Sequence, residues 1–200
     1  MAAKGFWGGQ GGALVDPKRS FRWLVSFGNN VQQQNGQSAV GLQEWYAKSA
    51  NKPSFSISET PHQFINHTFY YPGRVEWQTI DITLVDPSYP NDASQALVKA
   101  LNNSGYYLPT DIRSASNTIM KADAVNALGG QLKLKQLGAS DNDVLETWTL
   151  LNPWIKDVNF GDLDYGTEDM VNITLTVRYD YATLTVKGDT NPVSKPANQQ

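Results

Sequence analysis

The chain has 200 residues, 40% hydrophobic and 18% charged, and its 16 basic and 19 acidic side chains give a net charge of −3. Tight binding of nucleic acid needs an excess of Lys and Arg to displace counterions from phosphate, so this balance excludes a strong nucleic-acid binder. The lack of cysteine excludes disulfides, thiolate nucleophiles and zinc sites built on sulfur. No apolar run approaches the roughly 18 residues of a membrane span, so we expect no membrane anchor.

We expect a flexible N-terminal arm over residues 1–20, because the stretch MAAKGFWGGQGG is rich in glycine and lacks the apolar segment of a secretion signal. Residues 21–27 have large apolar side chains at every second position and predict the first strand. Gln, Asn and Gly dominate residues 31–50, which we interpret as an insertion. Alternation resumes in SFSISE, residues 54–59.

Aromatic residues gather in TFYYPGR, residues 68–74, which we interpret as an exposed turn or loop that contacts another chain or a ligand. In the following stretch, VEWQTIDITLVD, the apolar positions change parity once, between Trp77 and Ile80. Such a change indicates either a β-bulge or a strand that begins only at Thr79, and the sequence leaves both open.

The clearest helix is predicted within residues 88–105, where alanine and leucine recur at helical spacing between positions 93 and 101. Asn91 or Asp92 can cap its start, and Gly105 can adopt the left-handed conformation after its end. A second, weaker helix is predicted from about residue 117 to 128, before a Gly-Gly pair.

Residues 131–152 predict a long hairpin, and residues 171–181 predict one uninterrupted strand with apolar odd positions and polar even positions. The tail, 187–200, lacks the apolar content to become ordered. The sequence therefore predicts an α+β fold, mostly β, in one domain over residues 21–186. We expect about seven strands in an antiparallel β-sandwich or partial barrel, with one good helix flanking it. Trp23, Trp77 and Trp148 are expected in its core.

The sequence predicts no catalytic, cofactor-binding or metal-binding residues. His62 and His67 are the only histidines, and five residues of separation would place them on opposite faces of a strand. The stretch GGQGG lacks the preceding strand and the Lys-Ser/Thr of a phosphate-binding loop, and no G-x-S-x-G motif occurs.

Four acidic side chains cluster before the last alternating stretch, at Asp162, Asp164, Glu168 and Asp169. Their first part has the D-x-D-x-G spacing of a calcium loop, although the bidentate Glu of an EF-hand does not follow. Asp and Gly are also common turn formers. A solvated turn, a calcium loop and a functional acidic surface are therefore the three interpretations of this cluster.

Two stretches, YYPGRVEWQTIDITLVD and WTLLNPWIKDVNFGDLDYGTEDMVNITLTVRYDY, together resemble the tail tube proteins of contractile-tailed bacteriophages. In that family a Gly-Arg pair, an aromatic strand residue and an acid precede a helix. The closing section has a strand, a Trp or Pro near a turn, an acidic turn and a last alternating strand that ends in Asp-Tyr. The matching residues here are Gly73, Arg74, Trp77, Asp86, Pro153, Trp154, Leu163, Asp164, Tyr165, Asp180 and Tyr181.

The resemblance implies a virion protein without catalytic residues, assembled in the host cytoplasm as homo-hexameric rings that stack into a tube. The inner strands of a ring would join into one continuous β-barrel, through which DNA passes without specific binding. Tail sheath and baseplate proteins would be further partners. The segment Glu59–Pro72 resembles the family's loop that contacts the adjacent ring.

The resemblance also implies roles for named side chains. The contact residues between rings or subunits would be Phe64, Phe69, Tyr70, Tyr71 and Arg74. The candidate lumen face would be Asn172, Thr174 and Thr176, a neutral wall along which a polyanion slides without sticking.

Three other functions stay open at this point. A related tube initiator, terminator or baseplate piece would share these features. A carbohydrate-binding β-sandwich would use the exposed Tyr70 and Tyr71. A hydrolase would use Asp162, Asp164 and Glu168, but paired carboxylates need a cleft that the sequence does not indicate.

Overall fold

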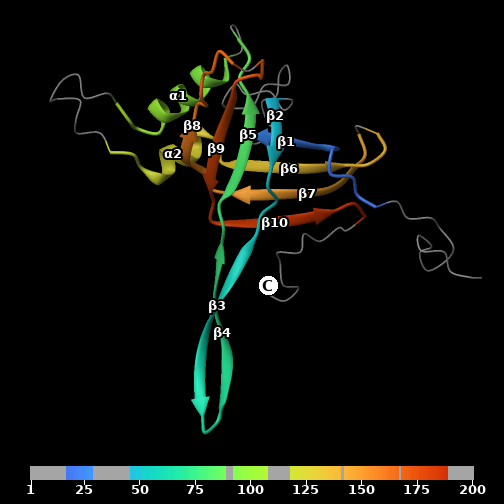
Figure 1. Ribbon diagram of the computed structural model, residues 1–200, viewed down its shortest axis with the longest axis vertical. Coiled ribbons are helices and arrows are strands. Elements are labelled where there is room, and N and C mark those ends of the chain that lie inside the picture. Colours follow the sequence, from blue (N-terminus) through green and yellow to red (C-terminus); the bar gives the residue numbers. More distant parts are fainter. Residues whose placement is uncertain are drawn as a thin grey trace, which may run out of the picture.

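The computed structural model describes residues 17–28, 46–88, 92–107, 118–140, 142–166 and 168–188. Two four-stranded antiparallel sheets cross each other in the body of the protein, and a long two-stranded hairpin projects from one of them (Figure 1). The predicted α+β, mostly β class is confirmed. Most of the predicted arm, most of the predicted insertion and nearly all of the predicted tail lie outside the described residues.

The first sheet has the strand order β1-β6-β7-β10. Its strands are β1 (Trp23–Phe27), β6 (Gln131–Leu137), β7 (Val144–Leu151) and β10 (Tyr181–Val186). Val25 of β1 pairs with Leu134 of β6, and both face the core because alternate positions of a strand share one face. The predicted hairpin over residues 131–152 is therefore confirmed as β6 and β7.

The second sheet has the order β2-β5-β9-β8. Its strands are β2 (Ala47–Ala50), β5 (Ile80–Val85), β8 (Trp154–Asn159) and β9 (Asn172–Arg178). Ile173, Leu175 and Val177 of β9 are completely buried, as the alternation predicts. The expectation of one strand up to residue 181 is wrong, because the chain turns at Asp180 and exposed Tyr181 begins β10 in the other sheet.

The hairpin consists of β3 (Phe55–Phe64) and β4 (His67–Trp77), joined by a turn at Ile65 and Asn66. The interpretation of residues 68–74 as a turn or loop is therefore wrong, since they lie in β4. The segment 59–72, which resembles the family's loop, is also a strand pair, in which all but the turn residues form one antiparallel ladder. The parity change before β5 has a related cause. Residues 78 and 79 separate β4 from β5, so the two parities belong to two strands.

Two helices lie beside β8 at one side of the body (Figure 1). They are α1 (Ala93–Asn103) and α2 (Lys121–Ala127). The Asp92 side chain accepts a hydrogen bond from the backbone N–H of Gln95 at 2.8 Å, which confirms one of the two predicted caps. Gly105 has a φ of 99°, so the predicted left-handed residue after α1 is confirmed as well. Within the described ranges, neither helix combines the length and apolar character that crossing a bilayer requires.

The core lies between the two sheets, with α1 closing one side. Its fully buried large side chains come from both sheets, from α1, and from the residues just before β2 and just after α2. They are Val25, Tyr46, Ile80, Ile82, Leu84, Leu97, Leu128, Leu132, Leu150, Ile173 and Leu175. Trp23, Trp77 and Trp148 are partly buried and pack against this core, as predicted. The described body is thus a complete sandwich, and the hairpin contributes little to it.

Candidate assembly surfaces

The β3–β4 hairpin presents most of the predicted contact residues, but on two faces. Phe64 pairs with His67, and His62 pairs with Phe69, so these four side chains share one face with Tyr71. Tyr70 pairs with Pro61 and lies on the opposite face. Phe64, Phe69, Tyr70 and Tyr71 are all exposed, and the other hydrophobic side chains exposed on the hairpin are Phe55, Ile57, Ile65 and Val75.

The two histidines lie on one face rather than on opposite faces. The parity expected for residues five apart applies within a single strand, whereas a turn at Ile65 and Asn66 separates His62 from His67. His67 makes an edge contact with Phe69 at a ring-centroid distance of 4.7 Å, and His62 contacts Tyr71 at 6.5 Å. This face of the hairpin tip is therefore a mixed aromatic and imidazole surface.

A bulge in the middle of the hairpin depends on Gly73. The register shifts between Ile57 and Glu59, and the Arg74 backbone N–H donates to the Ser58 hydroxyl at 2.9 Å. A Cβ atom on Gly73 would lie 2.4 Å from that hydroxyl oxygen and 3.0 Å from the Ser58 carbonyl oxygen. A side chain at position 73 would force Ser58 to move, which gives a physical reason for glycine there.

Two contacts hold the base of the hairpin to the body. The Arg178 guanidinium pairs with the Glu76 carboxylate at 3.2 Å. The Trp77 ring packs against Tyr179 of the body at 6.0 Å and, within the hairpin, against Phe55 at 5.4 Å. The direction of the hairpin is therefore set by the end of β9.

The candidate lumen residues lie on the outer face of the second sheet. Thr174 is exposed and pairs with Thr83 of β5, while the Thr176 hydroxyl donates to Asp81 at 2.7 Å. Lys48 of β2 donates to the Asn172 side-chain oxygen at 3.4 Å. These hydroxyl and amide groups face away from the core, as predicted.

The acidic cluster lies in the connection between β8 and β9. The Gly166 backbone N–H donates to the Asp164 carboxylate at 2.9 Å, the local bond of an Asx turn. Gly161 has a φ of 83°, and a Cβ there would lie 2.5 Å from the Asn172 carbonyl oxygen. Among the residues that the structure describes, no three carboxylate, histidine or cysteine side chains come together as metal ligands would. The described geometry is that of a turn.

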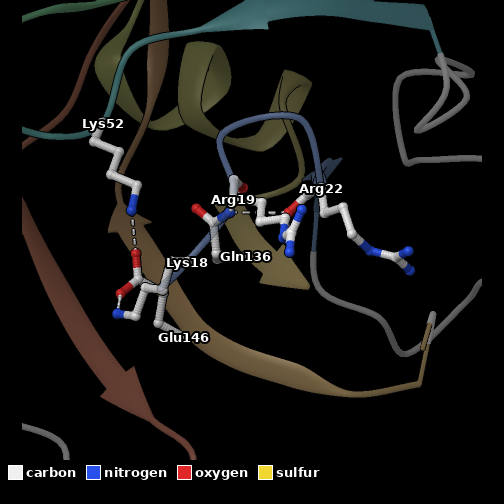
Figure 2. Close-up of polar contacts among 6 residues, drawn as sticks. All are labelled: Lys18, Arg19, Arg22, Lys52, Gln136 and Glu146. Carbon is white, nitrogen blue, oxygen red and sulfur yellow. Dashed lines mark hydrogen bonds and ion pairs between the residues drawn. The ribbon is translucent and has the colours of Figure 1, made fainter. Parts of the chain in front are cut away.

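Glu146 of β7 is a buried carboxylate that the sequence analysis missed. It is 5% exposed and accepts hydrogen bonds from the ammonium groups of Lys18 and Lys52 (Figure 2). Burial disfavours the charged form, but the two lysines outweigh this effect and hold the pKa of Glu146 below its usual value. The ion pairs connect the end of the predicted arm, the segment before β3, and β7.

The neighbouring Gln136 makes a second link to the same N-terminal segment. Its buried side-chain amide donates to the backbone carbonyls of Arg19 and Arg22, the latter at 3.0 Å (Figure 2). The described end of the predicted arm is thus bound to the first sheet through both neutral and charged hydrogen bonds.

Two aspartates that match the family pattern have structural partners. The Asp86 carboxylate accepts from the backbone N–H groups of Ala93 and Ser94 at 3.1 and 3.3 Å, and so caps the start of α1 from the end of β5. Asp180 accepts from Lys121 at 2.7 Å and from Asn152 at 2.8 Å. These hydrogen bonds hold the pKa of Asp180 below its usual value, against a smaller opposing effect of burial.

The fold is shared with components of contractile injection systems. The sheath/tube terminator of the extracellular contractile injection system PVC is 14% identical, with a TM-score of 0.60 over 87% of this chain and 100% of its own. The tube-terminating cap of the anti-feeding prophage (AFP) is 12% identical, with a TM-score of 0.59 over 87% and 94%. A chain of the PVC sheath-tube complex is 14% identical, with a TM-score of 0.55 over 85% and 92%.

No protein-family model matches the sequence, and no curated protein matches it either. At these low identities the comparison establishes the fold alone. The chain has the fold of contractile-tail tube and terminator proteins, as the sequence resemblance predicts, and the fold is not restricted to bacteriophages.

Proposed function

We propose that this chain is a structural subunit of a contractile tail tube, and that its function is assembly rather than catalysis. The observation that carries the proposal is the β3–β4 hairpin, which projects from a complete body and exposes aromatic side chains on both faces. An apolar surface of this kind is typical of an interface between chains. The PVC and AFP proteins of the same fold are named as tube and terminator components, which supports this role.

Hexameric rings are the assembly that we propose. In the described sheets, β2 and β8 lie at the two edges of one sheet, and β1 and β10 at the two edges of the other. An edge strand has unpaired backbone groups that a neighbouring copy can pair, and a closed ring of copies removes the edges. Six copies joined in this way would give the continuous inner β-barrel that the resemblance implies.

We infer that the outer face of β9, with Asn172, Thr174 and Thr176, lines the channel. Its hydroxyl and amide groups offer hydrogen bonds. The charges beside it cancel, because Arg178 pairs with Glu76 and the remaining charges are those of Asp81 and Lys48. Such a wall has no excess of positive charge to hold the phosphate groups of a passing polyanion. DNA would therefore move along it without specific binding. The sheath and baseplate are the partners that we propose for the outer surface and the end of the tube, within a phage virion assembled in the host cytoplasm.

Negative-stain electron microscopy across a concentration series, beside the mass in solution, tests the assembly. We expect rings of six and stacked tubes for the wild type, and the loss of stacking with single rings remaining in Phe69→Ser/Tyr71→Ser. The matched control is Val98→Ser, which removes an exposed apolar side chain from α1 instead of the hairpin. A protein that stays monomeric at the highest concentration contradicts the proposal and favours a carbohydrate-binding module.

The lumen assignment has its own test. Since the chain has no cysteine, Thr174→Cys introduces a single thiol. In assembled tubes we expect this thiol to react with a small maleimide but only slowly with a bulky polyethylene-glycol maleimide. The same cysteine in wild-type background, kept below the concentration at which the protein assembles, should react with both. Equal rates with the bulky reagent in both states would place Thr174 outside the channel.

A tube terminator is the second candidate, because the two terminator proteins have TM-scores of 0.60 and 0.59 against 0.55 for the tube-complex chain. A terminator is expected to form single rings that bind the end of a preformed tube. A tube subunit is expected to stack. Counting single and stacked rings in the same micrographs distinguishes the two.

A further inference from the structure

The connection between β8 and β9, residues 160–171, lies at the end of the second sheet that is remote from the hairpin. We call it the distal loop. In the β5–β9 ladder Ile80 pairs with Val177, next to the hairpin base, and Val85 pairs with Asn172 at the other end. The hairpin and the distal loop therefore occupy opposite ends of the long axis of the molecule (Figure 1).

Large apolar side chains in the described part of the distal loop are exposed to solvent. Leu163 is 88% exposed, Met170 is 72% exposed, and Tyr165 is completely exposed. Turn bonds at Asp164 and Gly166 fix the backbone locally but bury none of these groups. Both ends of the molecule thus carry an apolar surface that needs a partner.

The two ends differ in formal charge, because the distal loop is acidic whereas the outer hairpin is neutral. The distal loop has four acidic side chains, and no Lys or Arg occurs between residues 157 and 177. The outer hairpin, residues 59–74, contains both histidines of the chain and Arg74, against the single acid Glu59. When these two ends meet, apolar groups face apolar groups, the imidazole N–H groups of the hairpin can donate to the carboxylates, and no like charges are forced together.

We propose that the distal loop of one copy is the docking surface for the outer β3–β4 hairpin of the next copy along the tube axis. This inference rests on the proposed tube function and adds the receiving surface, which the contact residues of the hairpin do not identify. The contact is heterologous, since two different surfaces of the same chain meet, and it propagates without closing. One-directional stacking of rings follows from it.

Site-directed cross-linking in the full chain tests the contact directly, because no native cysteine interferes. One variant carries Asn66→Cys at the hairpin turn, and the other carries Leu163→Cys in the distal loop. The two differ in mass by a purification tag. After co-assembly, a short bismaleimide should give the mixed product at least about ten times faster than it does for Asn66→Cys mixed with Lys99→Cys. Lys99 is an exposed position on α1 and serves as the matched control.

Electron micrographs of the same samples separate the outcomes. Stacked rings without the mixed product, or with hairpin-to-hairpin product in its place, overturn the docking assignment and leave the tube function standing. Absence of any assembly overturns both.

A second variant tests the energetics without a cysteine. Leu163→Ser/Tyr165→Ser should raise the concentration needed for stacking by tenfold or more, because two exposed apolar side chains lose their burial. Single rings should persist in this variant. Unchanged stacking overturns the docking assignment.

Discussion

Replacement of the buried carboxylate Glu146 by glutamine should lower the stability of the folded subunit by about 2 kcal/mol. A buried hydrogen bond to a charged group contributes about 1.5–3 kcal/mol. Lys18 and Lys52 are 46% and 54% exposed, however, so solvent screens both interactions and the two together contribute less than their sum. For a chain of this length, 2 kcal/mol corresponds to a fall in Tm of about 4–8 °C.

The converse change should cost more. Lys18→Met/Lys52→Met leaves the Glu146 carboxylate buried without a cation, and breaking a buried pair from this side costs about 3–5 kcal/mol. The order of stability is therefore wild type, then Glu146→Gln, then the double lysine variant. This order distinguishes a buried charge that needs its partners from a surface ion pair of little consequence.

The pH dependence follows from the direction of the pKa shift. Because folding lowers the pKa of Glu146, its contribution is complete above the unfolded value of about 4.3 and is lost as the pH falls through the folded pKa. The stability difference between wild type and Glu146→Gln should therefore shrink on acidification below about pH 4.3. Urea unfolding, followed by tryptophan fluorescence at concentrations below assembly, measures it. A glutamine variant as stable as the wild type at pH 7, or a difference that is constant down to pH 3, refutes the reasoning.

Three further predictions concern the elements that position the assembly surfaces. Gly73→Ala should displace the hairpin bulge, because its Cβ would clash with Ser58. Stacked rings should then be lost in electron micrographs, while the Tm of the body in thermal unfolding stays within a few degrees of the wild type. Asp86→Ala should remove the cap of α1 and cost about 1–2 kcal/mol in urea unfolding, whereas Asp86→Asn, which keeps the acceptor, should cost less. Asp180→Asn should cost less than about 1 kcal/mol, because the Lys121 side chain is 59% exposed, and an effect as large as that of Glu146→Gln would contradict this ranking.

The buried strands were predictable from sequence because one of their faces meets a core. In β9, Ile173, Leu175 and Val177 alternate with polar residues, and the alternation is the direct consequence of a half-buried strand. In the hairpin this signal is confined to the start of β3, where residues 54–59 alternate. Both faces of the hairpin are exposed, so hydrophobic and polar residues follow no period over residues 60–72. A strand without such a period cannot be distinguished from a loop by its sequence pattern.

The sequence indicates that Glu146 must be paired, but it does not identify the residues that pair with it. Glu146 occupies a core-facing position of β7, in line with Trp148 and Leu150, and an acid at such a position must be paired. Its partners are 128 and 94 residues away in the chain, and no local pattern identifies them. The distal loop was noticed as an acidic turn, whereas its position opposite the hairpin depends on the register of β5 and β9.

The continuity of the hairpin with the body has a mechanical consequence. The strand β4 leads into β5 with only residues 78 and 79 between them, and β5 lies in the middle of the second sheet, between β2 and β9. Antiparallel hydrogen bonds run perpendicular to the strands, so a pull on the hairpin tip along the long axis loads the β5 ladders in shear. All the bonds of both ladders resist such a load together, whereas a pull across the sheet would break them one after another. Tension between successive copies would thus act along the strongest direction of the fold.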